Sequence, residues 1–273
     1  MNFAVISWIQ NKIRTCLVWC VIALASMTWQ ESGNAQTCED GFVLGADLCL
    51  VAKAYGVETS GSSPTLIVFL HGDMSRGGAA HYLFERAEAM ADIPGVVAVG
   101  LIRPGYYDND GNTSDGPNQR LDHYTESNNR AVAEAVQALK ERYSASKTIL
   151  VGHSGGAAQS AVIIGRYPEL AQAAVLVSCP CDIPKWRINR GRKPWPNSQS
   201  PIEFVDQVSS KIKIVAITGS DDSNTGMFLA QEYVDSMTAR GVDARFVMAR
   251  SARHGFNRQW PTVVAELRDL LSQ

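Results

Sequence analysis

Residues 151–156 read V-G-H-S-G-G and place one serine, Ser154, between glycines directly after an apolar, β-branched run. Gly152 and Gly156 complete the pattern G-x-S-x-G. In this pattern small residues let a strand and the following helix approach closely, while the serine hydroxyl is presented on a tight turn. Ser154 is therefore a candidate nucleophile. The same glycines also fit a purely structural turn, so the assignment depends on partners elsewhere in the chain.

A serine hydroxyl is a weak nucleophile near neutral pH and needs a base to take its proton, with an acid to orient that base. His254 is the one histidine that follows Ser154 in the sequence, between a predicted strand and the last predicted helix. The carboxylate candidates are Asp221 and Asp222, in the turn after another predicted strand. We expect Asp222 to be the acid because of its G-x-x-D spacing from Gly219, while Asp221 serves the turn.

Attack of such a serine on a carbonyl carbon creates a negatively charged oxygen, which backbone N–H groups must stabilise. Gly155 follows the candidate nucleophile at the start of its helix and offers one N–H group. The second is expected from the loop after the first buried strand, which begins His71-Gly72-Asp73-Met74. The N–H of Asp73 is the first choice for this oxyanion hole and that of Met74 the next. His71 is expected to orient the loop.

These residues require a scaffold that brings them together, and the sequence predicts one in which strands alternate with helices. The predicted strands are 48–55, 64–70, 96–102, 147–151, 173–177, 212–217 and 244–248. The predicted helices are 79–91, 127–143, 157–164, 226–239 and 258–271. Strands that are apolar almost throughout indicate a mostly parallel sheet covered on both faces, with sites at the carboxyl ends of the strands. Two long segments, 103–124 and 179–200, are predicted to be irregular.

Four motifs in this order resemble those of the α/β-hydrolase superfamily, and the resemblance runs from about residue 48 to the C-terminus. The motifs are His71-Gly72, the serine turn 152–156, the acid turn 219–222 and His254-Gly255-Phe256. The chain is similar to compact exported esterases and to the catalytic domains of prolyl-oligopeptidase-like or dienelactone-hydrolase-like enzymes. The resemblance implies an α/β-hydrolase fold with a mostly parallel eight-stranded sheet, and cofactor-free acyl transfer to water.

The first 35 residues have the pattern of a secretory signal. Two basic residues precede the apolar run 16–25, and residues 33–35 form a small-x-small site for signal peptidase. We expect cleavage after Ala35, with 23–25 as a second site and retention as an anchor as the alternative. The run is shorter than the roughly 20 residues that a membrane span needs. Export with cleavage is therefore favoured, to the periplasm or the extracellular space, with no stable membrane insertion afterwards.

Export would place the mature cysteines in an oxidising compartment. Cys16 and Cys20 would leave with the signal peptide. The mature chain would keep Cys38, Cys49, Cys179 and Cys181. Cys38 and Cys49 flank a predicted hairpin, so we expect a disulfide there. For Cys179-Pro180-Cys181, a tight disulfide and a reduced pair both remain open.

Residues 36–273 are expected to form one catalytic domain, because a hydrophobic content of 45% is enough for a sizeable core. A net charge of −2, with no block of like charge, gives no reason to expect a nucleic-acid partner. No cofactor and no metal are expected. Residues 179–200 follow the strand after the serine helix, where hydrolases often insert a cap, so this segment is a candidate small cap. Its basic residues could attract an anionic substrate or simply face solvent.

Together these features predict a secreted serine hydrolase that cleaves a carboxylic ester through a Ser-His-Asp triad and an acyl-enzyme intermediate. The expected partner is a small-molecule ester or peptide substrate. Two alternatives stay open: a serine peptidase of the prolyl-oligopeptidase type, since the same triad cleaves amides, and a non-catalytic binding module on the same fold.

Overall fold

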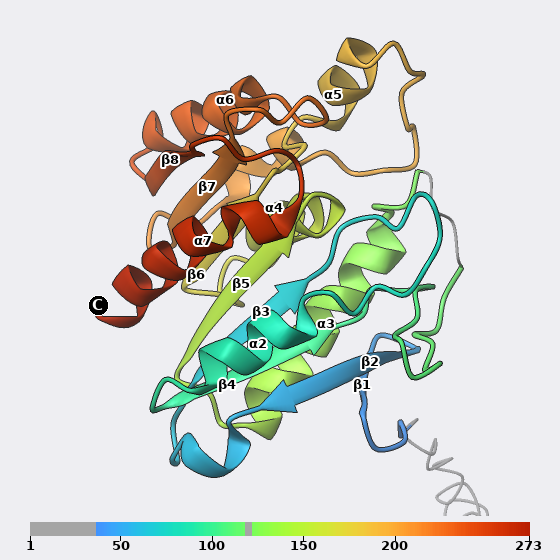
Figure 1. Ribbon diagram of the computed structural model, residues 1–273, viewed down its shortest axis with the longest axis vertical. Helices are drawn as coiled ribbons and strands as arrows, with labels where there is room; N and C mark the ends of the chain where they lie inside the picture. The colour runs from blue at the N-terminus through green and yellow to red at the C-terminus, as the bar shows by residue number, and fades with distance from the viewer. Residues whose placement is uncertain (1–36, 118–121) are drawn as a thin grey trace, which may run out of the picture. The chain divides into compact units, whose positions relative to one another are not determined.

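Eight strands form one sheet in the order β1-β2-β4-β3-β5-β6-β7-β8 in the computed structural model, which describes residues 37–117 and 122–273 (Figure 1). β2 is antiparallel to both of its neighbours, and the six strands from β4 to β8 in this order are parallel. The strands are β1 Phe42–Gly45, β2 Leu48–Tyr55, β3 Thr65–Leu70, β4 Val96–Leu101, β5 Lys147–His153, β6 Ala173–Val177, β7 Lys213–Gly219 and β8 Asp243–Ala249. The carboxyl ends of the parallel strands therefore meet at one edge of the sheet.

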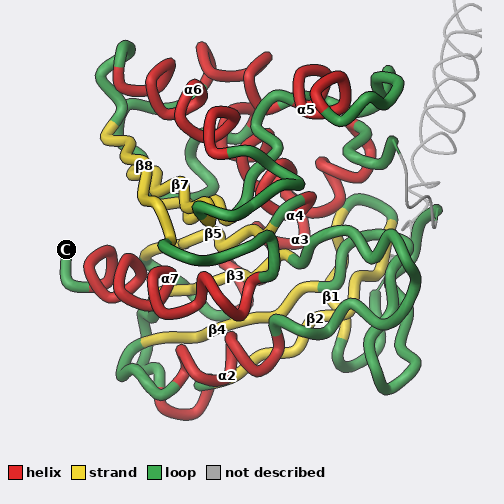
Figure 2. The backbone as a smooth tube through the Cα atoms, turned by 45° about the horizontal axis from the view of Figure 1, so that its top comes forward, coloured by secondary structure: helices red, strands yellow, loops and turns green. Residues whose placement is uncertain are grey.

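Helices cover both faces of the sheet, with α2 and α7 on one face and α3, α4 and α6 on the other (Figure 2). The helices are α2 Phe84–Ala91, α3 Glu126–Arg142, α4 Gly155–Arg166, α5 Ile183–Asn189, α6 Met227–Thr238 and α7 Phe256–Leu271, with short 3-10 helices η1 Val57–Thr59 and η2 Pro201–Gln207. Along β3, Leu66 and Val68 face the α3 and α4 side while Ile67 and Phe69 face α2 and α7. Successive strand residues point to opposite faces, so a strand buried on both sides must be apolar throughout. The predicted α/β-hydrolase fold is confirmed.

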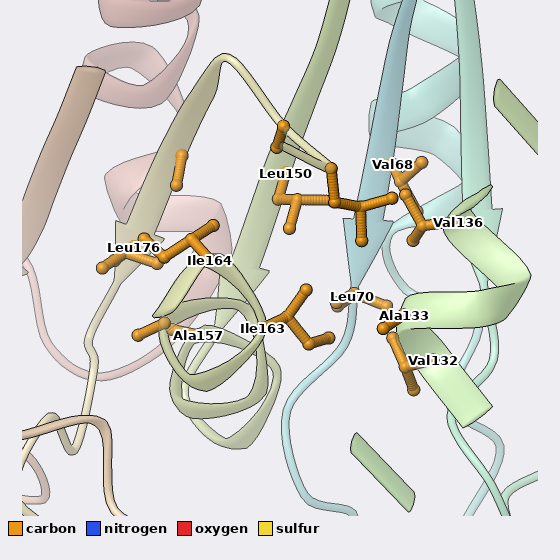
Figure 3. Packing of buried hydrophobic residues seen from close by; sticks show 14 of the residues in the cluster. Val68, Leu70, Val132, Ala133, Val136, Leu150, Ala157, Ile163, Ile164 and Leu176 are labelled. Atoms are coloured by element: carbon orange, nitrogen blue, oxygen red, sulfur yellow. The ribbon is translucent and has the colours of Figure 1, made fainter. Parts of the chain in front are cut away.

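The core that fixes α4 lies between β3, β5 and α3 (Figure 3). Val68 of β3 and Leu150 of β5 belong to the same fully buried cluster as Ala157 and Ile163 of α4 and Val132 of α3. Burial of one such aliphatic side chain is worth roughly 1.5–3 kcal/mol. This packing determines where the residue that joins β5 to α4 must lie.

Two predicted segments differ from the structure. The helix expected from residue 79 begins only at Phe84, because the backbone N–H of Ala80 donates a hydrogen bond to the carbonyl oxygen of Tyr107 instead of entering a helix. The segment 179–200, expected to be irregular, contains α5. Asp182 caps that helix by accepting a hydrogen bond from the N–H of Lys185, with a proline in its first turn.

The signal peptide predicted for residues 1–35, with Cys16 and Cys20, lies outside the described residues. None of the helices in the described part of the chain is long and apolar enough to cross a membrane. The predicted disulfide between Cys38 and Cys49 is confirmed, and Cys179 and Cys181 are also joined. The question left open for the Cys-Pro-Cys segment is thus answered in favour of a disulfide.

The disulfide between Cys38 and Cys49 should stabilise the folded chain. Its sequence separation is 11 residues, and a loop of that length corresponds to about 3 kcal/mol of denatured-state entropy. We expect the double variant Cys38→Ser with Cys49→Ser to lower the free energy of unfolding by about 2–3 kcal/mol in guanidinium titrations. An unchanged midpoint would show that the β1–β2 hairpin unfolds outside the main cooperative transition.

Candidate active site

Ser154 occupies the turn between β5 and α4 with a backbone φ of 52° and ψ of −115°. A positive φ is strained for a residue with a side chain. The flanking glycines make the turn sterically possible. A Cβ atom on Gly152 would collide with the backbone of Gly156 and Ala157, and one on Gly156 would collide with the carbonyl oxygen of Leu70 in β3. The tight turn predicted from the sequence for Ser154 is therefore present.

A continuous hydrogen-bonded chain joins Ser154 to His254 and Asp222. The distance from Ser154 Oγ to His254 Nε2 is 3.0 Å, and that from His254 Nδ1 to Asp222 Oδ2 is 2.9 Å. With Nδ1 donating to the carboxylate, Nε2 is free to accept the serine proton. Ser154 comes from the end of β5, Asp222 follows β7, and His254 lies between β8 and α7. The parallel sheet thus gathers at one edge three residues that are far apart in sequence.

The Asp222 carboxylate is held by several donors besides the imidazole. Its Oδ1 accepts the N–H groups of Asn224 and Thr225, each at 2.9 Å. Its Oδ2 accepts the hydroxyls of Thr225 at 2.8 Å and Ser178 at 2.7 Å. Burial alone would raise the pKa of Asp222, but the hydrogen bond and charge of His254, with these donors, lower it to about 2. Asp222 therefore stays ionised at any ordinary pH.

Asp221, the alternative acid, has a different environment. One oxygen of its carboxylate accepts the hydroxyl of Ser220 at 2.9 Å, and the side chain is exposed. Its backbone N–H donates to the carbonyl oxygen of Ala252. Asp221 thus serves the turn, and the structure brings only Asp222 to His254.

The loop after β3 lies against the start of α4. A Cβ atom on Gly155 would contact the Asp73 carboxylate and would lie 2.7 Å from the hydroxyl of Tyr124 and 2.9 Å from Nη1 of Arg103. The two residues expected to supply oxyanion N–H groups, Asp73 and Gly155, are therefore direct neighbours. Met74, the second choice, lines with Asp73 and Ser154 the same cavity of about 340 Å³.

The partly exposed Asp73 side chain anchors its own loop through an ion pair with a buried arginine. Its Oδ1 lies 3.0 Å from Nη1 of Arg103, a fully buried residue, and its Oδ2 accepts the hydroxyl of Tyr124 at 2.6 Å. Burial would lower the pKa of Arg103, but the charge of Asp73 raises it, so the guanidinium stays charged. Nδ1 of His71 lies 2.7 Å from the carbonyl oxygen of Gly72, and its Nε2 accepts the backbone N–H of Arg103 at 2.9 Å. Arg103 thus neutralises the Asp73 carboxylate beside the start of α4.

The candidate cap segment contacts residues 223 and 224, directly after the acid turn. Trp186 of α5 donates its ring N–H to the carbonyl oxygen of Asn224 at 2.8 Å, and Arg190 donates to that of Ser223 at 2.8 Å. The Asn224 side-chain amide lies 3.0 Å from His254 Nε2.

Of the basic residues in this segment, Lys185 pairs with Glu232, and Arg187 stacks on Trp195 with 4.3 Å between guanidinium carbon and ring centre. Arg187 is thus buried, whereas Lys185, Arg190, Arg192 and Lys193 are exposed, so most of these basic residues face solvent.

Several residues of the site were not singled out from the sequence. Arg103 directly follows a buried strand, and His153 lies inside the serine motif itself, so both positions carried a usable sequence signal. Ser178, Thr225 and Asn224 had none, because their contacts depend on how separate loops meet. In the described part of the chain, no group of three or more histidine, cysteine, aspartate or glutamate side chains is placed to hold a metal ion.

A family model described as the alpha/beta hydrolase family matches residues 67–273. The chain belongs to the alpha/beta hydrolase family. No curated protein sequence matches it at a significant level. Among solved structures it is similar to Est1E from Butyrivibrio proteoclasticus with bound ferulic acid, at 14% identity and a TM-score of 0.66, covering 84% of this chain and 97% of that one.

Two further structural neighbours cover this alpha/beta hydrolase to a similar extent. Esterase PE8 shows 21% identity and a TM-score of 0.62, covering 81% of this chain and 98% of that one. The acylaminoacyl peptidase of Pyrococcus horikoshii shows 12% identity and a TM-score of 0.67, covering 84% of this chain but only 40% of that one. At these identities the likeness concerns the fold. The family and its esterase and peptidase neighbours support a hydrolase.

The buried histidines of this structure predict a loss of stability on mild acidification. Burial, with the charge of Arg103, lowers the pKa of His123 to about 4 and that of His71 well below 6.5. Burial, with the charge of His254, lowers the pKa of His153 to about 3. The unfolded chain therefore binds more protons than the folded chain below about pH 6.5. The stability that these neutral histidines contribute is complete above that pH and is lost as the pH decreases toward 4.

We expect the free energy of unfolding to decrease between pH 7 and pH 5 by up to about 1.4 kcal/mol per pH unit for each such histidine. Replacement of His123 by glutamine should reduce by about one the number of protons taken up on unfolding. The slope of the free energy of unfolding against pH should then be smaller by up to about 1.4 kcal/mol per pH unit. Urea titrations at several pH values measure this slope. A wild-type stability that stays constant from pH 7 to pH 5 would contradict the neutral, buried state of these rings.

Proposed function

We propose that the protein is a serine hydrolase that cleaves carboxylic esters through an acyl-enzyme intermediate. The observation that carries this proposal is the hydrogen-bonded chain from Ser154 Oγ through His254 to Asp222, at 3.0 and 2.9 Å, with the Asp73 side chain packed against Gly155. A nucleophile, a base, an oriented acid and candidate oxyanion donors are the parts that acyl transfer requires.

In the first half-reaction, Ser154 Oγ forms a bond to the ester carbonyl carbon while His254 Nε2 takes the hydroxyl proton. The Asp222 carboxylate stabilises the imidazolium, and the N–H groups of Gly155 and Asp73 donate to the oxyanion. The intermediate then collapses: the bond to the alcohol oxygen breaks, and His254 gives its proton to that leaving group. In the second half-reaction, water attacks the acyl-enzyme by the same route and regenerates Ser154.

Esterase PE8, matched over 98% of its length, and Est1E with bound ferulic acid, matched over 97% of its length, support an ester substrate. The cavity beside Ser154 has a volume of about 340 Å³ and includes Met74 and Phe256, which suits a small ester with an apolar group.

We also propose export to the periplasm or the extracellular space, with residues 1–35 removed as a signal peptide. Two disulfides, Cys38–Cys49 and Cys179–Cys181, support an oxidising compartment. N-terminal sequencing of the mature protein should find Gln36 as the first residue. A protein that keeps Met1 or Asn2 in the membrane fraction would refute cleavage.

Replacement of the three triad residues tests the proposed mechanism. With a panel of p-nitrophenyl esters and aminoacyl amides, we expect Ser154→Ala or His254→Ala to lower kcat by about 10⁴-fold or more. Asp222→Asn should lower kcat by about 10³- to 10⁴-fold, because an amide leaves the imidazole in the wrong tautomer.

Asp221→Asn is the matched control, since it makes the same chemical change at the neighbouring residue. It should leave kcat within about twofold of wild type, because Asp221 does not contact His254. A larger loss in Asp221→Asn than in Asp222→Asn would overturn the acid assignment. Faster cleavage of amides than of esters would favour the peptidase alternative. A folded wild-type protein that cleaves nothing in the panel would favour the binding module.

A further inference from the structure

A second hydrogen-bonded chain lies beside Ser154, among residues that line the same cavity, and joins the two loops that flank it. The backbone N–H of Gly72 donates to the hydroxyl oxygen of Tyr82 at 2.6 Å. That hydroxyl lies 2.6 Å from Nδ1 of His153, and Nε2 of His153 lies 2.8 Å from the backbone carbonyl oxygen of His254. We call this chain the Tyr82–His153 bridge.

The chemistry of the groups fixes the direction of every hydrogen bond in the bridge. A carbonyl oxygen can only accept, so His153 Nε2 carries the ring proton and donates it to the His254 carbonyl oxygen. Nδ1 of the neutral ring then accepts the hydrogen of the Tyr82 hydroxyl, whose oxygen accepts the N–H of Gly72. Burial and the charge of His254 lower the pKa of His153 to about 3, so the ring remains neutral in the working range of the protein.

The two ends of the bridge hold the two loops that the proposed reaction needs. Gly72 immediately precedes Asp73, whose N–H is a proposed oxyanion donor, and the other end is the backbone of the proposed base, His254. Gly72 also packs directly against the nucleophile, because a Cβ atom there would lie 3.1 Å from the Cβ of Ser154. His153 is covalently adjacent to Ser154, and its ring centre lies 5.2 Å from that of His254.

We infer, resting on the proposed function, that Tyr82 and His153 are positioning residues that set the oxyanion loop and the base at a fixed separation around Ser154. Neither residue transfers a proton in the reaction. A shift of a donor or of the base by a fraction of an ångström reduces transition-state stabilisation more than substrate binding. Loss of the bridge should therefore lower kcat while leaving KM nearly unchanged.

Tyr82→Phe tests the bridge because it removes only the hydroxyl that joins Gly72 to His153. Tyr233→Phe is the matched control: Tyr233 is fully buried, and its hydroxyl has no hydrogen-bond partner in the described part of the chain. With a p-nitrophenyl ester, Tyr82→Phe should lower kcat by about 10- to 100-fold with KM changed by less than about threefold. Tyr233→Phe should keep both constants close to those of wild type. Equal kcat values for the two folded variants would overturn the inference.

His153→Gln and His153→Leu provide a second test that does not depend on Tyr82. The glutamine amide can still donate to the His254 carbonyl oxygen, whereas leucine fills the space without a polar group. We expect His153→Gln to retain at least about tenfold more kcat than His153→Leu. Equal losses in both folded variants would show that His153 acts only through packing.

Labelling by a fluorophosphonate separates failure of the bridge from failure of the proposed function. An active wild type that is labelled at Ser154, together with an unimpaired Tyr82→Phe, would refute the bridge alone. A folded wild type that is neither labelled at Ser154 nor able to cleave any ester would refute the proposed function and the inference that rests on it.

Discussion

The positive φ of Ser154 is the constraint on which the arrangement of the site depends. A non-glycine residue in this conformation costs of order 1–3 kcal/mol and persists only where surrounding packing requires it. Here the requirement comes from α4, whose Ala157 and Ile163 belong to the buried core with β3 and β5. Gly152 and Gly156 allow the close contact. The strain is thus balanced by core burial, and it holds the serine hydroxyl at the edge where the parallel strands end.

Around this turn, the charged groups are paired and held by hydrogen bonds. Asp222 receives hydrogen bonds from His254, Asn224, Thr225 and Ser178, and Asp73 is neutralised by Arg103. Uncompensated, the buried carboxylate of Asp222 would cost several kcal/mol. Because His254 and Ser178 reach Asp222 from two other loops, these three loops cannot shift independently. The same contacts that satisfy the charges therefore fix the positions of the reacting groups.

The sequence predicts the fold well because its evidence is local and repeated. Apolar strands alternate with helical segments, and the serine turn, the acid turn and the histidine motif each follow a strand. Residues whose role depends on distant partners escape this reasoning. Tyr82 lies in a segment predicted as helix, yet its hydroxyl reaches a histidine 71 residues away in sequence. The contact of α5 with the acid turn likewise arises only when the chain is folded.

The central claim, that Ser154 is the nucleophile, is tested most directly by locating a covalent adduct. The purified protein would be treated with a fluorophosphonate, digested, and mapped by peptide mass spectrometry. We expect one modified residue, Ser154, in the wild type, and no modification in Ser154→Ala. An adduct on another residue, or equal labelling of both proteins, would show that Ser154 is not the nucleophile.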